Sequence, residues 1–100
     1  MELSFTDKLL LQRFFAGKPV KKAYLFGSYS RREATPKSDV DILVELDHTH
    51  PIGMKFFVIQ NELEDLLQKK IDLVSTEGIS KYIQPTIDKE KILIYDRTAH

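Results

Sequence analysis

Apolar side chains recur along the chain with two spacings, one typical of helices and one typical of strands. The leucines and phenylalanines at positions 10, 11, 14 and 15 lie on one helical face. Thr6-Asp7 is typical of a helix start, and Gly17 and Pro19 end this predicted first helix. Helical spacing returns at apolar positions 56, 59, 63, 66 and 67, which predicts a longer helix over residues 54–70.

Four shorter segments have the residue types of strands. Residues 23–26 are rich in strand-forming side chains and end at Gly27. Residues 39–46 and 71–74 alternate between apolar and polar side chains, and residues 92–95 form a last apolar run. Each of these segments is short enough to be one strand of a small sheet.

The remaining segments connect these elements. We expect short helices over residues 28–34 and 81–89, a turn over residues 35–38 and a loop over residues 47–53. Helices and strands then alternate along the chain. This order predicts the α/β (α+β) class, with a small mixed β-sheet flanked by helices.

The composition restricts the kind of protein. One hundred residues suffice for one domain, and we expect residues 1–100 to form it. Apolar residues make up 42% and charged residues 30%, as in soluble globular proteins. The absence of cysteine excludes disulfides, zinc ribbons and thiol nucleophiles. The apolar runs are too short for a membrane span and the first residues lack a secretory signal, so we expect no membrane association and a cytoplasmic location.

The charges balance overall but not locally. Lys plus Arg and Asp plus Glu both number 15, so direct nucleic-acid binding, which needs a large basic excess, is not expected. Residues 1–37 hold eight basic and three acidic side chains, whereas residues 38–77 hold three basic and nine acidic ones. This division suits a site that holds both a polyanion and metal cations, although a solvated surface would also tolerate it.

Gly27-Ser28 lies between a predicted strand and a predicted short helix. Glycine lets backbone amides approach a ligand closely, and the N-terminus of a helix favours negative charge. The Ser28 hydroxyl can donate to a phosphate oxygen, and the guanidinium groups of Arg31 and Arg32 match phosphate geometry. A phosphate-binding turn is one interpretation of this segment, and a plain turn with Ser28 as a helix cap is the other.

Asp39 and Asp41 open an otherwise apolar strand. Residues i and i+2 of a strand point to the same face, where two carboxylates repel each other unless a cation lies between them. Aspartate is also disfavoured in strands. The pair therefore predicts a divalent metal site, with Mg²⁺ as the expected ion, unless both residues lie at a solvated strand start.

Asp72 is a third candidate carboxylate, because it interrupts the apolar strand at residues 71–74. If that strand adjoins the strand of Asp39 and Asp41, all three carboxylates can converge. Glu45 shares the predicted face of Asp41 and is the alternative third carboxylate. His48 and His50 could bind a metal in the loop, but no further ligand stands at a suitable spacing.

Two segments taken together resemble a known family. Residues 24–32, Tyr-Leu-Phe-Gly-Ser-Tyr-Ser-Arg-Arg, and residues 38–44, Ser-Asp-Val-Asp-Ile-Leu-Val, are similar to the core of the minimal nucleotidyltransferases (MNT) of the DNA polymerase β-like superfamily. Residues 66–74 resemble the strand that carries the family's third carboxylate. The resemblance covers about residues 5–95 and implies the polymerase β-like palm fold. Two residues depart from the family pattern: Ser30 stands where the family usually has alanine, and Arg32 stands where it often has glycine.

The resemblance also implies a reaction and its site residues. Asp39, Asp41 and Asp72 would be catalytic and would hold two Mg²⁺ ions. Gly27, Ser28 and Arg31 would bind the triphosphate of ATP, and AMP would pass to an acceptor hydroxyl. Relatives of this size pair with a helical HEPN-domain ribonuclease toxin, which implies a hetero-oligomer in which the enzyme is the antitoxin and a tyrosine of the toxin is the acceptor.

Two other functions remain open at this point. One is a degenerate nucleotidyltransferase that neutralises its partner by contact alone. The other is the catalytic subunit of a nucleotidyltransferase that modifies a small molecule. The intact set of three aspartates with Gly27 and Ser28 disfavours the first, and adduct formation without a partner would support the second.

Overall fold

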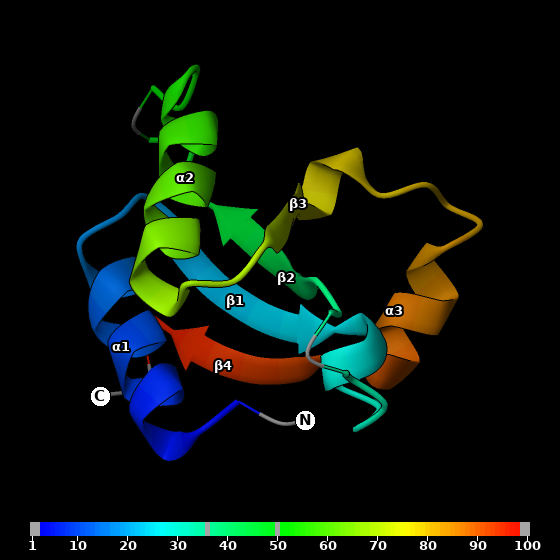
Figure 1. Cartoon of the computed structure of the whole chain (residues 1–100). Coiled ribbons are helices and arrows are strands. Elements are labelled where there is room, and N and C mark those ends of the chain that lie inside the picture. Colours follow the sequence, from blue (N-terminus) through cyan, green and yellow to red (C-terminus); the bar gives the residue numbers. More distant parts are fainter. Residues whose placement is uncertain (1–2, 36, 50, 99–100) are drawn as a thin grey trace.

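The structure is built on a four-stranded mixed sheet. The computed structural model describes residues 3–35, 37–49 and 51–98. The strands are β1 (Val20–Phe26), β2 (Val40–Leu46), β3 (Ile71–Ser75) and β4 (Ile92–Asp96), in the spatial order β3-β2-β1-β4 (Figure 1). β1 runs antiparallel to β2 and β4, whereas β2 and β3 are parallel. The predicted mixed sheet is therefore confirmed.

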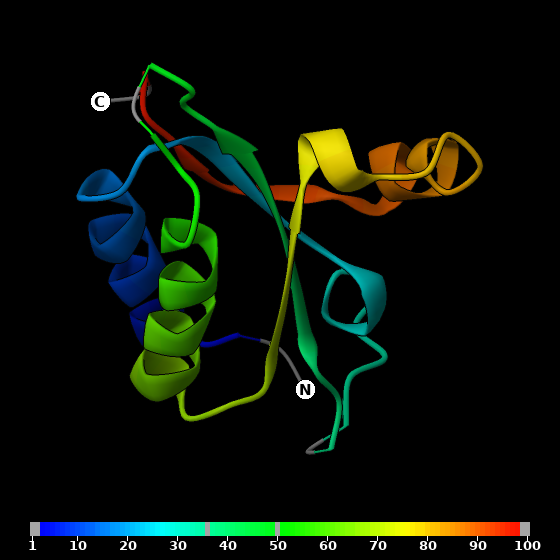
Figure 2. The same cartoon turned by 90° about the horizontal axis from the view of Figure 1, so that it is seen from above.

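The two faces of the sheet are covered differently. The helices α1 (Phe5–Ala16) and α2 (Lys55–Leu67) pack on one face (Figure 2). The other face carries α3 (Gln84–Glu90) and two single 3₁₀ turns, η1 (Gly27–Tyr29) and η2 (Thr76–Gly78). None of the helices in the described part of the chain is long and apolar enough to cross a membrane.

α1 begins one residue earlier than the sequence predicted. Ser4 is its N-cap, and the Ser4 hydroxyl accepts a 3.0 Å hydrogen bond from the backbone N–H of Asp7. The Asp7 carboxylate accepts in return from the Ser4 N–H, which completes a capping box. The predicted apolar face is confirmed, because Leu11 and Phe15 are fully buried.

α2 makes the parallel pairing of β2 and β3 possible. Parallel neighbours need a long crossover connection, and a helix usually supplies it. Ile59, Leu63 and Leu67 of α2 are buried in the core, as their spacing predicted. The helix ends three residues before the predicted boundary, because Gln68 takes a left-handed conformation with φ of 53°.

β2 is buried on both faces along most of its length. Val40, Ile42 and Val44 join the core under α1 and α2, as the alternation predicted. Leu43 lies on the opposite face and is also buried, with 1% of its surface exposed. On the face of Leu43, both Asp41 and Glu45 are half-buried, so the acidic face of β2 stays partly open at these two residues.

The predicted helix over residues 28–34 is wrong. Only η1, one turn of three residues, forms there. The last helix is shorter than expected and begins at Gln84 instead of residue 81. Pro85 lies in its first turn, where a missing backbone N–H costs no hydrogen bond.

Candidate active site

Asp41 and Asp72 lie side by side on neighbouring strands. They are directly paired in the parallel register of β2 and β3, so both side chains point to the same face of the sheet. Asp41 is half-buried and Asp72 is exposed. Asp39 is also exposed and immediately precedes β2. The expected meeting of the Asp39–Asp41 segment with Asp72 therefore occurs in the structure.

The surroundings of Asp41 disfavour its charged form. Burial raises its pKa most, followed by the negative charge of Asp72 and a hydrogen bond with that residue. Asp39 adds to the rise and the positive charge of Arg31 opposes it, with the result that the pKa of Asp41 moves from 3.8 to about 6. Like charges held this close are stabilised by a cation, so the donor set fits a divalent metal ion.

In the part of the chain that the structure describes, Asp39, Asp41 and Asp72 do not form a complete set of metal ligands. Among the residues that the structure describes, no group of three His, Asp or Glu side chains is arranged to hold a metal ion. Asp41 and Asp72 are a pair, and the exposed Asp39 would have to turn toward them. Glu45 is the poorer alternative, since it lies four residues beyond Asp41 on β2, about 13 Å along the strand.

Gly27 is required at its position for two separate reasons. Its φ is +70°, a left-handed conformation that side chains disfavour. A Cβ atom placed on Gly27 would lie 2.2 Å from Oδ2 of Asp41. The sequence predicted a glycine that lets phosphate approach the backbone, and the structure adds that this glycine makes room for the Asp41 carboxylate.

The turn after Gly27 is closed by its own polar groups. The Gly27 carbonyl accepts hydrogen bonds from the backbone N–H groups of Ser30 and Arg31, at 3.1 and 3.2 Å. Ser28 is half-buried beside it, and its carbonyl accepts from the Glu33 N–H at 2.8 Å. Since a first helical turn leaves its leading N–H groups without intrahelical partners, Gly27 and Ser28 can offer such donors to an anion.

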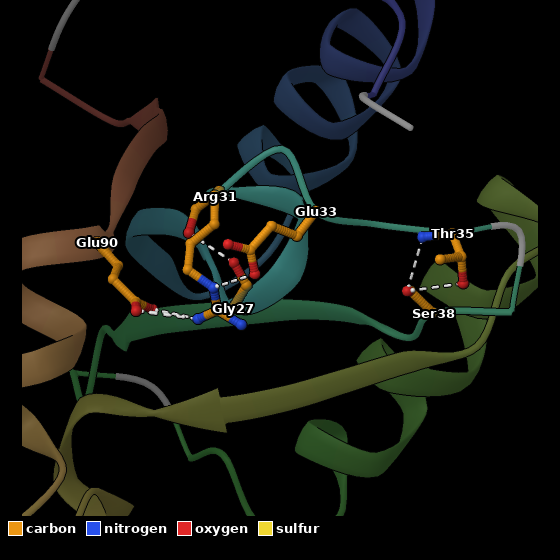
Figure 3. A network of polar contacts seen from close by, with 7 residues as sticks. Gly27, Arg31, Glu33, Thr35, Ser38 and Glu90 are labelled. Atoms are coloured by element: carbon orange, nitrogen blue, oxygen red, sulfur yellow. Dashed lines mark hydrogen bonds and ion pairs between the residues drawn. The ribbon is translucent and has the colours of Figure 1, made fainter.

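Arg31 is held by two carboxylates (Figure 3). Its Nε donates to Glu33 at 3.0 Å, and its Nη1 donates to both oxygens of Glu90 at 2.9 and 3.0 Å. These contacts raise the pKa of Arg31, with the Glu33 hydrogen bond as the largest cause. Sequence reasoning missed Glu90, which no local signal could reveal because it lies 59 residues further along the chain.

The segment before Asp39 is shaped by Thr35 and Ser38. The Ser38 hydroxyl accepts a 2.9 Å hydrogen bond from the Thr35 N–H (Figure 3). The Ser38 N–H donates to the Thr35 carbonyl at 3.0 Å. The turn expected here is confirmed at these two residues, while Pro36 lies outside the described residues. This turn brings the chain back from η1 to Asp39 and β2.

The family of the chain follows from its match to a family model. The model described as polymerase beta, nucleotidyltransferase, matches residues 10–100. The chain belongs to the polymerase β nucleotidyltransferase family.

Relatives of this nucleotidyltransferase have been named more narrowly. A Methanocaldococcus jannaschii protein named "Putative protein adenylyltransferase MJ0128" is 46% identical over 76 residues, which cover 75% of this chain and 76% of that protein. The protein adenylyltransferase MntA of Thermococcus cleftensis is 37% identical over 92 residues, which cover 92% of this chain and 88% of that protein.

The fold is shared with a solved toxin–antitoxin complex. A chain in the structure of a tri-AMPylated Shewanella oneidensis HEPN toxin with an MNT antitoxin matches with a TM-score of 0.68 and 19% identity. The match covers 91% of the present nucleotidyltransferase and 71% of that chain. At this identity the likeness concerns the fold alone.

The structure explains the two departures of this nucleotidyltransferase from the family pattern. The Ser30 hydroxyl donates to the Gly27 carbonyl at 2.8 Å and so adds a third bond to the turn. Arg32 has φ of 60°, a conformation that glycine adopts without strain. The frequent glycine at this position thus has a backbone reason, and Arg32 takes the same conformation here.

His48, in the loop after β2, contacts Glu77 and, among the described residues, none of the three aspartates. Nε2 of His48 contacts the carboxylate of Glu77 in η2. This contact ties the loop after β2 to the turn after β3. His50 lies outside the described residues.

Proposed function

We propose that this nucleotidyltransferase transfers AMP from ATP to a hydroxyl group of a partner HEPN toxin and thereby acts as its antitoxin. The observation that carries the proposal is the paired Asp41 and Asp72 beside the Gly27 turn. This is an acidic edge that would hold divalent cations, next to backbone donors suited to phosphate. Two relatives carry the name protein adenylyltransferase, which supports a protein as the acceptor of AMP.

Asp39, Asp41 and Asp72 are the residues that would hold divalent cations, with two Mg²⁺ ions as the expected complement. Such ions neutralise phosphate charge and stabilise the attacking and leaving oxygens of an in-line displacement. Asp41 would stand at the centre of the set, because Asp72 pairs with it directly and Asp39 precedes it by two residues. Gly27, Ser28 and Arg31 would bind the triphosphate with backbone N–H, hydroxyl and guanidinium donors.

The reaction is a displacement at the α-phosphorus of ATP. The acceptor oxygen forms a bond to this phosphorus, and the bond between the α-phosphorus and the bridging oxygen breaks. Pyrophosphate leaves, and AMP stays on the acceptor. The acceptor proton passes to a nearby base, for which the exposed carboxylate of Asp72 is the candidate. Positioning and charge neutralisation dominate catalysis of this type of transfer, so a few acids and a glycine turn suffice.

A tyrosine of the HEPN toxin is the proposed acceptor. The solved complex that shares the fold contains an AMPylated HEPN toxin beside an MNT antitoxin. A phenolic hydroxyl on a protein surface can enter an open acidic edge such as that of Asp41 and Asp72. We infer that the two proteins form a hetero-oligomer and that AMP transfer takes place in the cytoplasm.

The direct test is transfer of labelled AMP. The nucleotidyltransferase is mixed with Mg²⁺, ATP labelled on the α-phosphate and the HEPN protein encoded beside it. We expect label on the HEPN protein, mass spectrometry to find it on a tyrosine, and ribonuclease activity to fall in parallel. Unlabelled toxin, with nucleotidyltransferase that is folded and binds ATP, would refute the proposal. Label on a small alcohol without any partner would instead support the small-molecule alternative.

A further inference from the structure

Glu90 reaches Arg31 from another element, whereas Glu33, the other carboxylate bound to Arg31, lies only two residues from it along the chain. Glu90 is the last residue of α3, the helix that leads into β4. Both of its carboxylate oxygens accept from Nη1 of Arg31, and these contacts bridge α3 and the Gly27 turn (Figure 3). Glu90 is the most buried member of the group, with 21% of its side chain exposed against 43% for Arg31 and 65% for Glu33.

The contacts leave one end of the guanidinium available. Nε of Arg31 is used by Glu33 and Nη1 by Glu90. Within the described residues Nη2 makes no hydrogen bond. Because a guanidinium group is planar and rigid, fixing Nε and Nη1 also fixes the direction of Nη2.

The guanidinium lies close to the acidic site. The Arg31 backbone N–H is bonded to the Gly27 carbonyl, so the residue starts from the proposed phosphate-binding turn. Its positive charge also acts on Asp41, on the neighbouring strand. Nη2 is therefore a fixed cationic donor at the edge of the site, where an exposed and unrestrained arginine would first have to lose side-chain freedom.

We propose that Glu90 is a positioning residue that orients Arg31 for the triphosphate of ATP. The inference deepens the proposed function and rests on it. Glu90 itself would touch no substrate, since its carboxylate would repel the phosphates, and it would act only through Arg31. Glu33 would assist less, because its more exposed contact with Nε is weakened by water.

The test measures equilibrium binding of a non-hydrolysable ATP analogue with Mg²⁺ by calorimetry, without the partner. Glu90→Gln should weaken binding by about tenfold, as expected when a charge-assisted contact loses its charge. Asp88→Asn is the matched control, because Asp88 lies on the same helix and pairs with Lys91, not with Arg31. This control should bind as the unsubstituted protein does, and thermal unfolding should show both variants folded.

A double substitution separates positioning from a general effect on α3. In an Arg31→Ala background, Glu90→Gln should cause no further loss of affinity, because the residue through which it acts is gone. Equal affinity for Glu90→Gln and the unsubstituted protein would overturn the proposal. Tighter binding by Glu90→Gln would overturn it too, because Glu90 would then compete with phosphate for Arg31. If the unsubstituted protein binds no Mg²⁺–ATP analogue, the proposed function fails, and this inference fails with it.

Discussion

At the scale of single residues, Gly27 and Asp41 constrain each other. Gly27 directly follows β1, whose last residue, Phe26, pairs with Asp41 on the antiparallel strand β2. The absent side chain of Gly27 leaves the space that the Asp41 carboxylate occupies. A glycine known from sequence as a flexible turn residue thus also sets the position of a carboxylate.

Substitution of Gly27 should therefore affect activity more than stability. Gly27→Ala should lower the free energy of unfolding by about 1–2 kcal/mol through backbone strain, and AMP transfer should fall to background because Asp41 is displaced. Gly53→Ala is the matched control, since Gly53 also has a positive φ of 45° but nothing lies within 4 Å of its added Cβ. Urea unfolding and the labelled-ATP assay measure the two effects. Full activity in Gly27→Ala would contradict this prediction.

Arg32 offers a test of backbone strain alone. Arg32→Gly and Arg32→Ala remove the same side chain, but only glycine adopts φ of 60° without strain. We expect the glycine variant to have the larger free energy of unfolding, by about 1 kcal/mol. Urea unfolding of both variants measures the difference, and equal stabilities would mean that the left-handed conformation at Arg32 is not maintained in solution.

The raised pKa of Asp41 predicts a definite pH dependence. Its folded-state pKa of about 6 lies above the ordinary 3.8, so the folded protein takes up this proton first as the pH falls. The contribution of Asp41 to stability is therefore unfavourable above pH 6, improves between about pH 6 and 4, and is constant below that range. Asp41→Asn should be more stable than the unsubstituted protein above pH 6 and should lose this dependence.

Carboxyl titration by NMR provides the measurement for Asp41. Without metal, its midpoint should lie near pH 6. Addition of Mg²⁺ should lower the midpoint, because a bound cation stabilises the ionised form. A midpoint near 4 without metal would contradict the burial of Asp41 and its close contact with Asp72.

At the scale of elements, α2 decides where the carboxylates meet. It carries the chain from the end of β2 to the start of β3, and the two strands therefore run parallel. In that register Asp72 lies beside Asp41, while Glu45 is opposite Lys22 of β1. α1 and α2 form the core on the far face of the sheet and leave the acidic face to η1, η2 and α3 (Figure 2).

This separation of the two faces predicts that capping of α1 affects stability alone. Ser4→Ala removes the hydroxyl that accepts from Asp7 and should cost about 1 kcal/mol of unfolding free energy. AMP transfer at a temperature well below unfolding should be unchanged, because α1 lies on the core face. Urea unfolding and the transfer assay check both parts, and a drop in activity without a drop in stability would be inconsistent with the described layers.

At the scale of the whole molecule, we expect catalysis and partner contact to be separable. Asp39→Asn combined with Asp41→Asn removes charge from the acidic edge while both residues keep their size. We expect this variant to fold, to bind the HEPN toxin and to transfer no AMP. Toxin that is incubated with this double variant and ATP should keep its ribonuclease activity. Neutralisation as complete as with the unsubstituted protein would favour the contact-only function.

The local pattern of the chain was sufficient for most elements. Leu11 and Phe15 of α1, and Ile59 and Leu63 of α2, are buried as their helical spacing predicted. The helix expected over residues 28–34 failed, because the positive φ of Gly27 and Arg32 and the bonds to the Gly27 carbonyl favour a single turn. The polar pattern there could not distinguish a helix from such a turn.

The sequence by itself determined the alternation of helices and strands, the family resemblance and the identity of the three aspartates, because these depend on side chains near one another along the chain. Only the tertiary structure decided that Asp72, and not Glu45, lies beside Asp41. It alone brought Glu90 to Arg31 and Gly27 against the Asp41 carboxylate. Strand register and helix placement join residues far apart in the chain, and no local spacing contains that information.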